Sequence, residues 1–165
     1  MVNRYLQYGL ITLVLLLLQT TVLRLVALEG ISPDVLAIWI AYLAVVEGQM
    51  SASVWGFGIG LVFDFVTGNF IGLFALTKTI CGFVAGFFFN ENTTKLTLAS
   101  YRYLLIVLIS SFCQNVLYFL IFTLGSGISP VGAIIRFGVP TSLYTAALSL
   151  FPIIVLSRRS ALQNV

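Results

Sequence analysis

The sequence predicts an all-α fold, a polytopic membrane helix bundle of about six transmembrane helices with the N-terminus and the C-terminus both inside (N-in and C-in). The chain is 60% hydrophobic with a mean hydropathy of +1.11. Only 8% of its residues are charged, whereas about a quarter are charged in a soluble protein. Its 165 residues accommodate about six spans of ~20 residues with short loops. We therefore expect a single integral membrane domain over residues 1–165.

Apolar segments separated by turn residues define the expected spans, which are about 6–27, 33–47, 51–67, 71–89, 101–124 and 131–156. The apolar run of the first segment is longer than the ~7–15 residues of a signal peptide, and no Ala-x-Ala site follows it, so we expect a retained span. The second segment has only twelve uninterrupted apolar residues, Val35 to Val46. The second and third segments therefore either cross the membrane with polar ends or form a re-entrant pair.

Turn and capping residues mark the segment boundaries. Ser32 or Asp34 beside Pro33, and Ser129 before Pro130, can each accept a hydrogen bond from the first turn of a helix. The orientation follows from the basic residues, because cytoplasmic loops are enriched in Lys and Arg. With the N-terminus inside, Arg24 alone lies in an outer loop, and five basic residues lie on the cytoplasmic side: Arg4, Lys95, Arg102, Arg158 and Arg159.

Two stripes of small residues recur every four positions. The first consists of Ala52, Gly56, Gly60 and Asp64, and the second of Lys78, Gly82 and Gly86. Residues at this spacing lie on one face of a helix, and small side chains let two helix backbones approach closely in lipid. The two faces could pack against each other. We also predict that Gly56 and Gly60 contact a partner helix, with Asp64 positioning its outer end.

Polar residues of five segments fall at a similar depth near the outer face, when a rise of about 1.5 Å per residue is used. This predicted polar layer consists of Asp34, Asp64, Lys78, Gln114 and Arg136. A charge in the hydrocarbon costs about 3 kcal/mol on insertion scales and usually finds a partner. We expect Asp64 to pair with Lys78 or Arg136. The pair would lock two helices, but the layer could also contact a partner protein, reach the interface or line a ligand pocket.

The sequence lacks the residues that several classes of function require. The chain has no histidine, and its two cysteines, Cys81 and Cys113, lie within apolar runs. We therefore expect no metal site, no cofactor site and no catalytic triad, and we expect that the protein is not an enzyme. The net charge of +3 comes from scattered basic residues, which fit membrane orientation better than nucleic-acid binding.

Spaced motifs make the chain similar to the MreD family of bacterial rod shape-determining proteins. The most specific is the block from Gly60 to Leu73, with Asp64, Gly68 and Gly72 four residues apart. The others are Ser32-Pro33-Asp34, Glu47-Gly48 and Arg136-x-x-x-Pro140. The resemblance covers nearly the whole chain in length and spacing.

The resemblance implies a non-enzymatic, multi-pass component of the bacterial inner (cytoplasmic) membrane that belongs to the cell-elongation machinery. Proteins of this kind bind the single-span protein MreC, act alongside the MreB filament and influence RodA with its penicillin-binding transpeptidase. The fold is also similar to the substrate-binding subunit of energy-coupling-factor vitamin transporters. That similarity implies an alternative function, a small-molecule-binding subunit that uses the polar layer.

Overall fold

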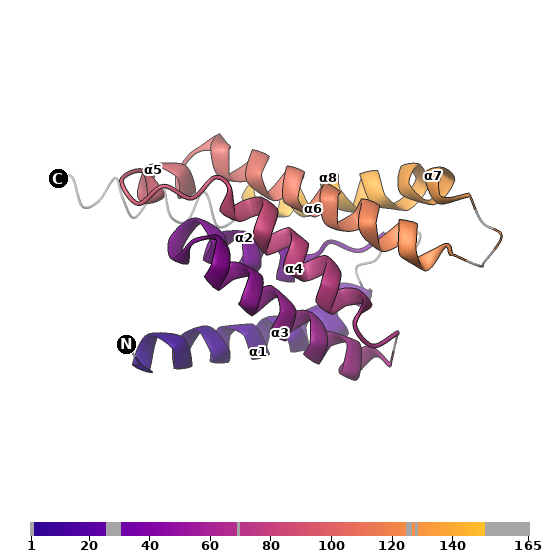
Figure 1. Ribbon diagram of the computed structural model, residues 1–165, viewed down its shortest axis with the longest axis horizontal. Coiled ribbons are helices and arrows are strands. Elements are labelled where there is room, and N and C mark those ends of the chain that lie inside the picture. Colours follow the sequence, from indigo (N-terminus) through magenta and orange to yellow (C-terminus); the bar gives the residue numbers. More distant parts are fainter. Residues whose placement is uncertain (1, 26–30, 69, 125–126, 128, 151–165) are drawn as a thin grey trace.

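A computed structural model describes residues 2–25, 31–68, 70–124, 127 and 129–150, and these residues form an all-α bundle (Figure 1). Within these ranges the elements in chain order are α1 (Val2–Leu25), α2 (Val35–Glu47), α3 (Gln49–Thr67), α4 (Leu73–Gly86), α5 (Thr94–Leu98), α6 (Tyr101–Phe122), α7 (Pro130–Ala133), the π-helix η1 (Ile134–Gly138) and α8 (Val139–Leu148). Helices therefore occupy part of each of the six predicted ranges. Residues 26–27 and 151–156 of the first and last ranges lie outside the described residues.

Three stretches of helix in the described part of the chain are long and apolar enough to cross a membrane. They are Gln49–Thr67, Tyr101–Phe122 and Pro130–Leu148. The helices α2 and α4 are apolar but shorter. At about 1.5 Å per residue, each covers about 20 Å of a hydrocarbon core of about 30 Å. The molecule is an all-α membrane helix bundle, and whether α2 crosses the membrane stays a prediction.

The short helix α2 is the central element of the bundle. Its fully buried side chains are Leu36, Ala37, Ile40, Ala41, Leu43 and Ala44. It lies against α4, α3, α1, α6 and α8, so its apolar character reflects contact with protein on several sides. The outward-facing side chains of α1, α3 and α6 are large and apolar instead, as expected for helices in lipid.

The end of α1 near the N-terminus is fixed to α2 by polar and aromatic contacts. The Tyr8 hydroxyl donates to Glu47 Oε1 at 2.8 Å, and Arg4 forms an ion pair with the same oxygen at 2.7 Å. The indole of Trp39 packs edge-on against the Tyr8 ring and donates to Thr12 Oγ1 at 3.0 Å. At the opposite end of the bundle lie the end of α3, the start of α4 and helix α7 (Figure 1).

Both predicted caps form. Asp34 Oδ1 accepts a hydrogen bond from the amide of Ala37 at 3.0 Å, and Ser129 caps α7, which begins with Pro130. Two elements were not predicted. Helix α5 lies between the fourth and fifth predicted spans, and the last predicted span contains η1. A π-helix widens one turn of a helix and frequently occurs at functional sites.

Candidate functional site: a buried ion pair beside a cavity

Asp34 is the centre of a buried polar cluster at the start of α2. Its Oδ2 forms an ion pair with Lys78 of α4 and also accepts a hydrogen bond from Gln114 Nε2 of α6. The backbone amide of Asp34 donates to Thr145 Oγ1 of α8 at 3.0 Å. The Lys78 side chain is only 1% exposed. One carboxylate and its own amide therefore join four helices.

The side chain of Gln19 fixes the same segment from α1. Its Nε2 donates to the carbonyl of Pro33 at 3.1 Å, and its Oε1 accepts from the amide of Val35 at 3.0 Å. These backbone groups precede or begin α2 and have no partner within that helix. Gln19 thus satisfies backbone groups that the helix itself cannot.

The ion pair differs from the predicted one. Lys78 pairs with Asp34, and Asp64 forms no ion pair with any residue in the described part of the chain. Asp64 is fully buried and accepts hydrogen bonds from the backbone amides of Gly72, Phe74 and Ala75, at 2.9, 3.2 and 3.1 Å. The amides at the start of a helix carry partial positive charge and lack helical partners. The start of α4 therefore takes the place of the predicted basic side chain.

We expect Asp64→Ala to lower the free energy of unfolding by about 1–3 kcal/mol, because it removes the acceptor of three amides at the start of α4. Asp64→Asn keeps one acceptor oxygen, so we expect a smaller loss. Thermal unfolding of the purified protein in detergent measures both. Equal stability of Asp64→Ala and the wild type would contradict the capping role.

The glycine stripes of α3 and α4 pack against each other. A Cβ added at Gly56 would lie 2.4 Å from the carbonyl oxygen of Lys78, and one at Gly60 would lie 2.4 Å from that of Phe74. Gly82 approaches the backbone of Ala52 in the same way. The two helices are joined by a short turn in which Gly68 and Gly72 adopt positive φ angles of 67° and 101°, which only glycine adopts readily.

In this structure, α4 thus occupies the glycine face that the sequence analysis assigned to a partner helix. The physical reason is proximity, since closing a short turn loses little chain entropy.

Arg136 also departs from the predicted polar layer. It is exposed, and its guanidinium lies 5.6 Å from the ring centroid of Phe137. Of the predicted layer, the structure brings Asp34, Lys78 and Gln114 into direct contact.

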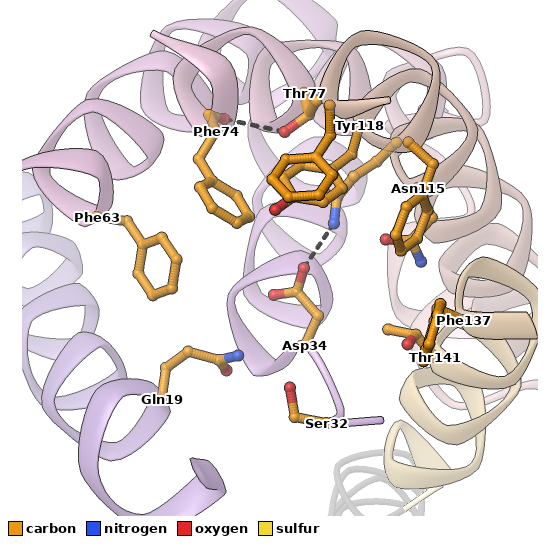
Figure 2. A pocket seen from close by; sticks show the side chains of 13 residues that line it. Gln19, Ser32, Asp34, Phe63, Phe74, Thr77, Asn115, Tyr118, Phe137 and Thr141 are labelled. Atoms are coloured by element: carbon orange, nitrogen blue, oxygen red, sulfur yellow. Dashed lines mark hydrogen bonds between the residues drawn. The ribbon is translucent and has the colours of Figure 1, made fainter. Parts of the chain in front are cut away.

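A cavity of about 370 Å³ opens beside this cluster. Figure 2 shows Gln19, Phe63 and Phe74 on one side of the cavity and Asn115, Phe137 and Thr141 on the other, with Asp34 between them. Gln114 lines the cavity as well. It is 3% exposed, and its Oε1 has no hydrogen-bond partner among the described residues. The site therefore combines a compensated charge and a buried acceptor that has no partner with aromatic side chains on both sides of Asp34.

Sequence reasoning missed the residues that α8 contributes to the cluster. Asn115 Nδ2 donates to Ser142 Oγ at 2.9 Å, and Thr145 accepts from Asp34. Ser142, Thr145 and Ser149 are buried and recur every three or four residues in an apolar segment. This spacing places them on one helix face, and small polar residues on such a face are typical of helix contacts in membranes. The spacing of these small polar residues was the signal in the sequence that could have identified the contribution of α8.

Comparison with known proteins identifies the family of the chain. No curated protein and no solved structure gave a significant match. The family described as rod shape-determining protein MreD matches residues 2–158 of the 165-residue chain, and this match includes α1 to α8 and every residue of the site. The chain therefore belongs to the MreD family of rod shape-determining membrane proteins.

Proposed function

We propose that the protein is a non-enzymatic, multi-pass component of the bacterial inner membrane that scaffolds an MreC-like single-span protein and thereby regulates peptidoglycan synthesis and cell shape. The observation that carries the proposal is the MreD family match over residues 2–158. RodA, its penicillin-binding transpeptidase and MreB are proposed as further partners of the same machinery. Because the matched family is described by shape determination, we favour this function over the transporter alternative.

A groove between α1 and α3 supports the proposal that a helix of the partner docks there. It measures about 470 Å³ and is lined mainly by apolar and small residues: Gly9, Thr12, Leu13, Leu16, Val54, Trp55, Gly58, Ile59 and Val62. A Cβ added at Gly9 or Gly58 would meet no heavy atom within 4 Å. These two glycines are thus free of the intramolecular contacts that cover Gly56 and Gly60.

The chemistry of the groove fits one transmembrane helix. Helices associate in lipid through close packing at small residues, and the groove offers a glycine on each of its two walls. A partner with a single span supplies such a helix and needs no second membrane contact. We therefore place the partner helix along α1 and α3, with Gly9 and Gly58 at the closest approach.

We expect Gly58→Leu to reduce co-purification of the MreC-like partner about tenfold or more, because the leucine fills the groove where the backbones approach. The measurement is affinity purification from membranes that contain both full-length proteins. Gly132→Leu is the matched control, since Gly132 lies on α7 and has room for a side chain. Unchanged co-purification in both Gly58→Leu and Gly9→Leu would show that the partner binds elsewhere.

A further inference from the structure

The face of α3 that lines the α1–α3 groove has a gap between two larger side chains. Gly58 lies one helical turn from Val54 and one from Val62, and all three line the groove. Val54 and Val62 are 70% and 47% exposed, whereas a Cβ at Gly58 would meet no heavy atom within 4 Å. We propose that this gap is a hole that receives a large apolar side chain of the partner helix. The inference rests on the proposed function and names the chemistry of the helix that docks there.

The two glycine faces of α3 have different shapes. Ala52, Gly56 and Gly60 form an uninterrupted row of small residues, and α4 lies directly against it. A Cβ added at Gly56 or Gly60 would lie 2.4 Å from a backbone oxygen of α4. A flat row of this kind accepts a helix backbone. A glycine between two valines instead interrupts a ridge of side chains, and such a gap is filled by a side chain of the facing helix.

The opposite wall and the floor of the groove leave room for this side chain. On α1, Gly9 precedes Leu13 by one turn, and a Cβ at Gly9 would also meet no heavy atom within 4 Å. The buried side chains of Thr12 and Ile59 and the half-buried Trp55 form the floor. The groove of about 470 Å³ is thus a space that the described part of the chain leaves unfilled.

The groove is formed before any partner binds, because α1 is fixed to α2. Several side chains of α1 form hydrogen bonds or an ion pair with α2 or with the residues just before it. They are Arg4, Tyr8, Thr12 and Gln19. These contacts extend along most of α1 and hold it in place beside α3. A preformed site loses less conformational entropy on binding than one that must first open.

The lining of the groove determines the chemistry of the inserted side chain. None of its lining residues is charged, and the hydroxyl of Thr12 already accepts a hydrogen bond from Trp39 at 3.0 Å. A charged side chain in the gap would therefore find no opposite charge, and burying a charge without one is unfavourable. Leucine, isoleucine, methionine or phenylalanine fills the gap by packing alone. We expect one such residue of the partner's span to face Gly58.

An exchange of side chains between the two proteins tests the inference. Each large apolar residue of the partner's span is shortened to alanine, one at a time, and co-purified from membranes with the full-length wild-type chain and with Gly58→Leu. We expect one alanine variant to bind the wild type about tenfold more weakly. The same variant should bind Gly58→Leu better than the unaltered partner does, because the new leucine occupies the space that the removed side chain left.

Val66→Leu is the matched control for this exchange. Val66 is exposed on the same helix and is not among the residues that line the groove, so the alanine variant should bind Val66→Leu no better than the wild type. If no alanine variant restores co-purification of Gly58→Leu, the inference is overturned while the docking site stands. Unchanged co-purification of the partner by both Gly58→Leu and Gly9→Leu overturns the docking site itself.

Disulfide crosslinking in membranes gives a second readout that needs no bulky substitution. Gly58→Cys, oxidised together with partner variants that carry single cysteines, should crosslink most strongly at the position that the alanine series identifies. The chain with only its own Cys81 and Cys113, which lie on α4 and α6, gives the background. A strongest crosslink at a small residue of the partner's span would show that Gly58 faces backbone, and it would overturn the inference.

Discussion

Gly60→Leu is expected to prevent α3 and α4 from packing and to leave little folded protein in the membrane. The Cβ alone would lie 2.4 Å from the carbonyl oxygen of Phe74 and 2.5 Å from the Cα of Ala75. Backbone atoms cannot move aside as a flexible side chain can. Overpacking a core typically costs about 1–3 kcal/mol, and we expect Gly60→Leu to exceed that range. Yield of monodisperse protein and thermal unfolding in detergent measure the loss.

Gly58→Leu is the matched control on the same helix. Gly58 is two residues away, and a Cβ there would meet no heavy atom within 4 Å, so we expect a folded protein with near wild-type stability. The two variants add the same side chain to the same helix and differ only in the face that receives it. A stable Gly60→Leu protein would show that α3 and α4 are not packed as described.

The contrast between Gly58 and Gly60 illustrates how much of the fold could be predicted from the sequence. The four-residue spacing of small residues correctly indicated that the faces of α3 and α4 could pack against each other. Spacing identifies which residues share a face, but it does not say which helix covers that face. Gly58 carried no periodic signal because it falls between Gly56 and Gly60 of the first stripe. Whether its face is open depends on the position of α1.

The polar cluster also shows that the sequence predicts which residues can meet but not which of them pair. Rise per residue placed Asp34, Lys78 and Gln114 at a common depth, and the structure brings them together. Depth along a helix follows from the sequence, whereas the rotation of each helix depends on packing against all its neighbours. Lys78 therefore reaches the central helix α2 instead of Asp64 on α3. The start of α4 satisfies Asp64 through backbone amides, which a search for charged partners does not consider.

One residue that lines the cavity lies where the helix geometry is irregular, which the sequence did not predict. Phe137 lies in η1, and its neighbour Gly138 accepts a hydrogen bond from Ser142 at 2.8 Å. A regular helix through the same residues would present them at different angles. The sequence supplied the polar groups of the site, whereas no pattern in the sequence singled out the aromatic residues that line the cavity.

Lys78→Met is expected to lower the free energy of unfolding by about 3–5 kcal/mol, because it leaves the Asp34 carboxylate buried without its cation. Asp34→Asn should also destabilise the protein, since it leaves the ammonium group of Lys78, which is 1% exposed, buried without its anion. Asparagine still offers an oxygen to the amide of Ala37, so the cap of α2 is retained in that variant. The double variant should therefore be more stable than Lys78→Met alone. A double-mutant cycle of unfolding free energies measures this coupling, and strictly additive losses would show that the two groups do not compensate each other's charge.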